Sequence, residues 1–193
     1  RMDSTQIASN IMDMSRLQLL VEALQRVYRI LSEADQKRYG EVFAPYLLEH
    51  SGQYVYRIKG KGETEDHLRR IGEVICHLLD ELKADYAQKP TYQVLQRFFD
   101  DNFRLEAAEV QSKTNEELES GCLQSVDDLE ATYRKKGQNK YKGYVANLTE
   151  TCDPENELQL ITKVQVAPNN VDDIHLLVDA LPDLRERTEL DTL

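Results

Sequence analysis

Apolar residues recur every three or four positions through much of the first half of this chain. Leu17, Leu20, Leu24 and Leu31 mark the first such stripe, and three further stripes follow before residue 103. This spacing places the apolar side chains on one face of an α-helix. Because an isolated amphipathic helix is marginal in water, the four apolar faces need one another. We therefore predict a four-helix unit over residues 13–103.

Capping and helix-breaking residues set the expected limits of these helices. Ser32–Asp35 is expected to end the first helix and cap the second, which Pro45 limits because proline lacks an amide hydrogen. The segment Ser51–Gly62 holds four glycines or serines, so we expect a loop or a short hairpin arm there. Thr64 and Thr91 are the expected N-caps of the third and fourth helices.

Outside the helical unit, the sequence predicts mainly strands. Arg1–Ala8 is a short predicted strand, and Lys142–Thr151 and Leu158–Val166 are predicted to form an antiparallel hairpin around a turn with the sequence CDPEN. A helix is expected from Val171–Asp173 onward, and Glu189–Leu193 reads as a further strand. The predicted fold class is therefore α+β. The residues of the last helix expected to point inward are Ile174, Leu177, Val178 and Leu181.

Composition and charge exclude several classes of protein. With 193 residues, 40% hydrophobic and 31% charged, the chain can form a packed core. Acids outnumber bases 35 to 24, which excludes a generally basic nucleic-acid-binding surface but allows a local basic site. The sequence has neither a long apolar run nor a signal peptide, so we expect no membrane span. Its three separated cysteines predict neither a disulfide framework nor a zinc site.

One segment runs against the acidic balance. Residues 131–149 contain five bases and no acid, interleaved with tyrosines. Lysine and arginine side chains neutralise phosphates, so this window is a candidate nucleic-acid contact. The alternative is a solvated loop that leads into the hairpin. The candidate DNA-binding residues are Arg134, Lys135, Lys136, Lys140 and Lys142.

Among the carboxylates, Asp3 is the first candidate for chemistry. It stands beside Ser4 at the end of the predicted first strand, where a carboxylate can bind a hard divalent cation. An ordinary turn or cap aspartate is the alternative. We expect Asp127-Asp128 to lie in a solvated loop and Asp172-Asp173 to cap a helix. The four histidines have neither ligand spacing nor a paired nucleophile.

Two blocks of the sequence together resemble DDE insertion-sequence transposases. The first is Arg1–Gln25, with its Asp-Ser-Thr triplet, and the second is Asp127–Asp173, with its LTETC and LIT runs. The resemblance implies a partial ribonuclease H-like sheet made of strand 1, hairpin strands 2 and 3, a helix and strand 4. It divides the chain into a first core strand at 1–12, a large helical insertion at 13–125 and the rest of the core at 126–193.

The resemblance also implies a site. Asp3 corresponds to the first catalytic aspartate and metal ligand, Mg²⁺ or Mn²⁺ is the expected cofactor, and transposon-end DNA is the expected partner. The second aspartate and the glutamate of the family are expected beyond Leu193, so we expect a fragment that is inactive alone. The sequence departs from the family pattern at Leu129, Thr132, Val145 and Asn147, which reduces the basic contacts expected from the hairpin.

Other functions fit the same residues. The four apolar stripes and the acidic balance also suit a non-enzymatic helical protein-interaction module. A different nuclease of the same fold is a third reading, because a fold does not fix a reaction. A transposase implies a bacterial cytoplasmic protein that is nucleoid-associated when bound to DNA, and it leaves a homo-oligomer open.

Overall fold

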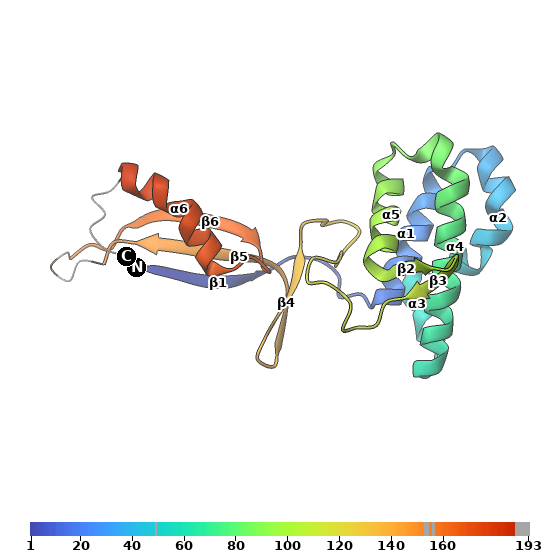
Figure 1. Ribbon diagram of the computed structural model, residues 1–193, viewed down its shortest axis with the longest axis horizontal. Coiled ribbons are helices and arrows are strands. Elements are labelled where there is room, and N and C mark those ends of the chain that lie inside the picture. The colour runs from blue at the N-terminus through green and yellow to red at the C-terminus, as the bar shows by residue number, and fades with distance from the viewer. Residues whose placement is uncertain (49, 153–154, 156, 188–193) are drawn as a thin grey trace. The chain divides into compact units, whose positions relative to one another are not determined.

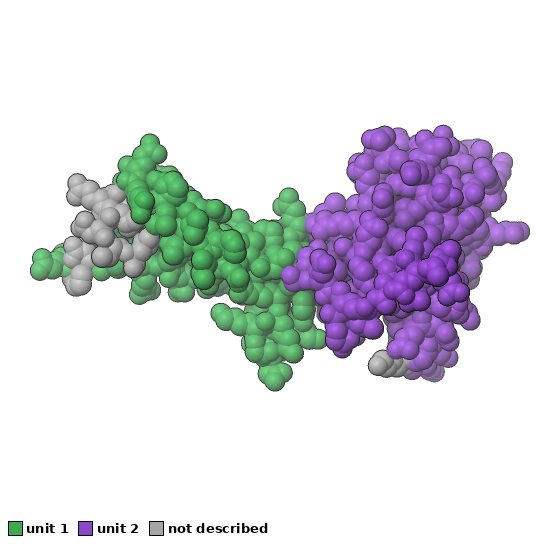
Figure 2. Space-filling view, in the orientation of Figure 1, with its two compact units in different colours: residues 1–10, 130–193 green, residues 11–129 purple. Residues whose placement is uncertain are grey.

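The computed structural model describes residues 1–48, 50–152, 155 and 157–187. The chain divides into two compact units (Figure 2): a sheet unit, Arg1–Asn10 with Glu130–Leu193, and a helical unit, Ile11–Leu129. Within the described residues the fold is α+β, as predicted, with six helices and antiparallel strands. None of the described helices has the length and apolar content needed to cross a membrane.

Five helices and a short hairpin form the helical unit (Figure 1). The side chain of Ser15 caps the first helix by accepting a hydrogen bond from the amide of Gln18. Ser32 caps the second helix in the same way through the amide of Asp35, as its sequence predicts. The elements are α1 (Arg16–Ile30), α2 (Glu33–Leu47), α3 (Ser51–Tyr56), α4 (Lys61–Tyr86), α5 (Pro90–Asn102), β2 (Phe103–Glu106) and β3 (Glu109–Ser112).

The apolar stripes of α1, α2, α4 and α5 meet in one core, as their periodicity predicts. Burying each large aliphatic or aromatic side chain contributes about 1.5 to 3 kcal/mol. This burial holds together helices that are marginal alone. The most completely buried side chains include Leu20, Leu24, Phe43, Ile71, Ile75, Leu78, Leu95 and Phe98.

Several predicted limits in the helical unit are wrong. The expected N-caps Thr64 and Thr91 lie inside their helices, because α4 begins at Lys61 and α5 begins at Pro90. The segment expected to be a loop begins with α3, because Tyr54 and Val55 pack against the core and Ser51 is buried. Helix α5 begins at Pro90, where the missing amide hydrogen has no consequence because the first helical amides have no partner within the helix. Pro45 lies in the last turn of α2, which ends two residues later at Leu47.

The β2–β3 hairpin was not predicted. Its turn residues Ala107 and Ala108 have φ values of 49° and 66°, a left-handed conformation that glycine or asparagine usually takes. The sequence therefore lacks the usual turn signal. The hairpin packs near Gly72 of α4, where an added Cβ atom would lie 2.6 Å from the ring of Phe103.

In the sheet unit, the long strand β5 (Asn139–Glu150) is central. β1 (Met2–Ala8) pairs with one edge of β5, and β6 (Ile161–Pro168) pairs with the other, both antiparallel. β4 (Thr132–Lys136) pairs with the first residues of β5, before β6 takes over the same edge. The predicted first strand and the predicted antiparallel strand pair are thus confirmed, and most of the predicted CDPEN turn lies outside the described residues. β4 falls in the basic window, where the sequence predicts no strand.

Gly143 permits the close approach of β1 to β5. Its φ is +138°, and an added Cβ atom would lie 2.4 Å from the carbonyl oxygen of Ile7 and from the amide nitrogen of Ser9. Only a residue without a side chain tolerates both the conformation and the contact. Gly143 also pairs with both Ala8 and Thr132, so it marks where three strands meet.

The order β1, β5, β6 and then α6 (Asp173–Arg187) agrees with the first four elements that the resemblance implies. The fourth strand was predicted at 189–193, which lies outside the described residues. The ribonuclease H-like topology therefore stays a prediction.

Helix α6 lies on one face of this sheet, and its predicted inward face is wrong at two of four positions, because Leu177 and Leu181 are half-buried but the other two are exposed. Ile174 and Val178 are 73% and 59% exposed. Two polar contacts accompany this orientation: the Ser4 hydroxyl donates to Asp173, and the Gln165 amide donates to the carbonyl of Leu176. The buried positions are Leu176, Ala180 and Leu184.

Candidate functional site

Asp3 lies near the start of β1 with its side chain exposed. Its Oδ1 accepts a hydrogen bond of 2.9 Å from the amide of Ser4. No ion pair to Asp3 is present in the part of the chain that the structure describes. An exposed carboxylate of this kind fits one ligand position of a divalent cation.

The surroundings of Asp3 supply little more for a metal. The register places Asp3 opposite Leu148, which lies opposite Val164, so these side chains share the sheet face away from α6. Leu148 and Val164 are 37% and 58% exposed. Within the described residues, no group of three histidine, cysteine, aspartate or glutamate side chains could hold a metal ion. Asp3 is thus a single exposed carboxylate at the end of an apolar sheet face.

The basic window forms the hairpin of β4 and β5. Gly137 and Gln138 are its two turn residues. Gly137 has φ +63°, and tight two-residue hairpin turns favour glycine at the first position because that position needs a positive φ. Lys135 lies directly opposite Lys140, and Lys136 lies beside the turn. We call residues 135–140 the hairpin tip. All six are exposed.

The charges at the hairpin tip are not neutralised. Among the described residues, the side-chain ammonium groups of Lys135, Lys136 and Lys140 have no ion-pair or hydrogen-bond partner. Like charges directly opposite one another across two strands destabilise a sheet. The arrangement therefore weakens the hairpin in the absence of an anion, and an anion that binds between the lysines relieves the repulsion.

Arg134 and Lys142 differ from the three tip lysines. The Arg134 guanidinium donates to the carbonyl oxygens of Asn169 at 3.1 Å and Val171 at 3.3 Å. It also lies 3.6 Å from the carboxylate of Asp172. Lys142 is half-buried and interacts within the chain. The structure thus uses Arg134 to join β4 to the loop before α6.

Asn169 is the centre of this junction, and no sequence signal pointed to it. Its side chain is 0% exposed. It accepts a hydrogen bond of 2.8 Å from the Thr132 hydroxyl and donates one of 3.1 Å to the carbonyl of Tyr141. Because these residues are far apart in the sequence, only the folded sheet brings them together. The junction holds the base of the basic hairpin.

The other carboxylate pairs have structural roles. Asp127 forms an ion pair with Arg26, with 2.8 Å between Oδ1 and Nη2. Asp172 accepts hydrogen bonds from the backbone of the first turn of α6 through its carbonyl oxygen, and Asp173 accepts from Ser4. Asp127 thus lies in a loop, as predicted, whereas the Asp172 and Asp173 carboxylates contact Arg134 and Ser4, and the predicted side-chain cap stays a prediction.

The thiols and histidines do not form a reactive site among the described residues. All three cysteines are free. Burial raises the pKa of the thiols of Cys76 and Cys122, so both are neutral near pH 7. His67 makes a hydrogen bond of 2.8 Å between its Nδ1 and the hydroxyl of Tyr54, a contact within the helical core.

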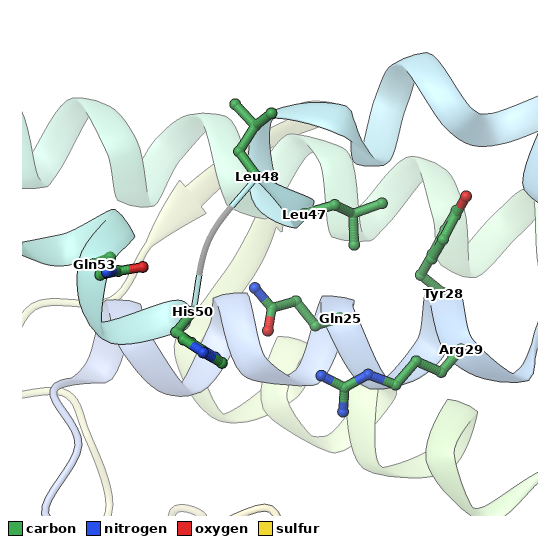
Figure 3. Close-up of a pocket in the computed structure, with 7 residues that line it drawn as sticks. All are labelled: Gln25, Tyr28, Arg29, Leu47, Leu48, His50 and Gln53. Carbon is green, nitrogen blue, oxygen red and sulfur yellow. The ribbon is translucent and has the colours of Figure 1, made fainter.

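The helical unit has a groove of its own (Figure 3) with a volume of about 540 Å³. It lies where the end of α2 and the start of α3 meet α1. The Gln25 amide at its floor donates to the carbonyl of Tyr46 at 2.7 Å. The described lining residues are Gln25, Tyr28, Arg29, Leu47, Leu48, His50 and Gln53. Sequence patterns did not identify this groove.

Comparison with known proteins identified no relative: no protein-family model, curated protein or solved structure matches the chain.

Proposed function

We propose that this chain is part of a DDE-type DNA transposase, in which the sheet unit contacts DNA and contributes one carboxylate to the metal site. Three exposed lysines without partners, on a hairpin of a chain with net charge −11, carry the proposal. An acidic protein that concentrates unpaired positive charge at one tip is suited to bind a polyanion locally.

Asp3 contributes to the same proposal through its position. It is exposed on β1, the strand that pairs with the long strand of the basic hairpin. Divalent cations held by such carboxylates stabilise the attacking and leaving oxygens in phosphodiester cleavage and transfer. Mg²⁺ commonly binds one or two carboxylates together with substrate phosphate oxygens. Asp3 supplies one of the carboxylates that this chemistry needs.

Duplex DNA binding tests the proposal. We expect the affinity for a short duplex, measured by fluorescence anisotropy, to fall steeply as the NaCl concentration rises. The triple substitution K135Q/K136Q/K140Q should abolish most of this binding. The matched control K37Q/K83Q/K89Q removes the same charge from exposed lysines of the helical unit and should bind as the wild type does. Equal loss in both triple variants would contradict a local site.

A second experiment tests Asp3. Binding of Mn²⁺ to the chain with duplex present, followed by electron paramagnetic resonance, should weaken in Asp3→Asn. The control Asp127→Asn removes a carboxylate that is paired with Arg26 and should leave Mn²⁺ binding unchanged. Unchanged binding in Asp3→Asn would remove this residue from the proposed metal site.

A helical protein-interaction module is the second candidate function. The groove of the helical unit favours it, because Leu48, one of its lining residues, is 77% exposed, and Arg29 and His50 also line it. This reading predicts no salt-dependent duplex binding. The DNA titration therefore separates the two functions.

A further inference from the structure

The three lysines of the hairpin tip are not equivalent in the strand register. Lys135 and Lys140 are exact cross-strand neighbours, whereas Lys136 lies opposite Asn139. Directly opposed residues in an antiparallel pair have Cβ atoms about 4.5 to 5.5 Å apart. Two flexible lysine side chains at this separation can bring both ammonium groups to one anion.

The chemistry of the tip favours phosphate over bases. Tyr133 and Tyr141, the nearest aromatic residues, are half-buried, so the exposed tip offers no ring for stacking. Proteins that bind single strands rely on such stacking, whereas contacts to the backbone of a duplex need only positive charge and hydrogen-bond donors. The hairpin tip therefore suits the sugar–phosphate backbone of duplex DNA.

We propose that Lys135 and Lys140 together bind a single backbone phosphate of duplex DNA, while Lys136 contacts a different phosphate. This inference rests on the proposed function and adds its binding mode. The lysines recognise only the charge and position of the phosphates, so the affinity for duplex DNA should not depend on its base sequence. In the free protein the two ammonium groups repel each other. In the complex both are attracted to the same phosphate, which offsets that repulsion.

The salt dependence of binding tests this stoichiometry. Each neutralised phosphate contributes about 0.9 to the slope of log affinity against log salt concentration. If one phosphate is shared, K135Q or K140Q alone should lower affinity but leave the slope nearly unchanged, because the remaining lysine still neutralises it. The double variant K135Q/K140Q should make this negative slope shallower by about 0.9. The control K136Q alone should also make the slope shallower by about 0.9.

The alternative outcomes are distinct. Losses of about 0.9 in each of K135Q and K140Q, and about 1.8 in the double variant, would show two separate phosphates and overturn the shared contact while leaving DNA binding intact. Absence of duplex binding by the wild type at low salt would overturn both proposals. Equally tight, lysine-dependent binding to vesicles of phosphatidylserine would assign the pair to a membrane surface and also overturn it.

Discussion

Replacement of Asn169 by alanine should loosen the base of the basic hairpin. The substitution removes two side-chain hydrogen bonds, to Thr132 and to the carbonyl of Tyr141, at a position that is 0% exposed. A buried polar group left without a partner costs about 1 to 3 kcal/mol. The Thr132 hydroxyl keeps one contact, from the amide of Asn170 at 3.3 Å, so we expect a total loss of about 2 to 4 kcal/mol.

Hydrogen exchange is the suitable assay for this prediction, because a chain with two compact units need not unfold in one step. A loss of about 2 to 4 kcal/mol corresponds to exchange roughly 30-fold to 1000-fold faster for the protected amides of β4. The matched control is Asn115→Ala, at an exposed position outside the junction. If β4 exchanges at the same rate in both variants, the junction does not hold the hairpin.

Three further substitutions or conditions give clear expectations. Gly143→Ala should destabilise the pairing of β1 with β5 by about 2 to 4 kcal/mol, because its Cβ atom would lie 2.4 Å from backbone atoms; loss of exchange protection in β1 measures this. Lys140→Glu should stabilise the hairpin by about 0.2 to 1 kcal/mol by pairing opposite charges, yet weaken duplex binding, as melting and anisotropy will show. Hydrogen bonds from Arg187 and Lys163 hold the pKa of Asp183 down to about 2, below its ordinary value of 3.8. The stabilisation that the ionised Asp183 carboxylate gives the folded chain is therefore complete above pH 3.8 and is lost as the pH falls through about 2. An NMR titration of the Asp183 carboxyl with a midpoint near 3.8 would contradict this.

Local patterns were sufficient to predict most elements of the fold. The spacing of apolar residues identified α1, α2, α4 and α5, because each helix buries one face in a shared core. The three segments predicted as strands within the described residues correspond to β1, β5 and β6. Helix α3 and the β2–β3 hairpin were missed, since tertiary packing stabilises the first and alanines occupy the turn of the second.

The candidate site was only partly predictable from sequence. The excess of basic residues pointed to the hairpin, but it did not separate Lys135 and Lys140, which are exposed, from Arg134, which the structure uses internally. That distinction depends on strand register and on Asn169, which lies far along the chain. Long-range pairing of this kind has no local signature in one sequence.

The most direct test of the account is to map where duplex DNA contacts the chain. Amide chemical shifts recorded with and without a short duplex report the contact residue by residue. We predict that the largest changes fall at residues 134–142, with further changes along β1 near Asp3. Changes confined to the helical unit, or none at a DNA concentration that saturates anisotropy, would contradict the account.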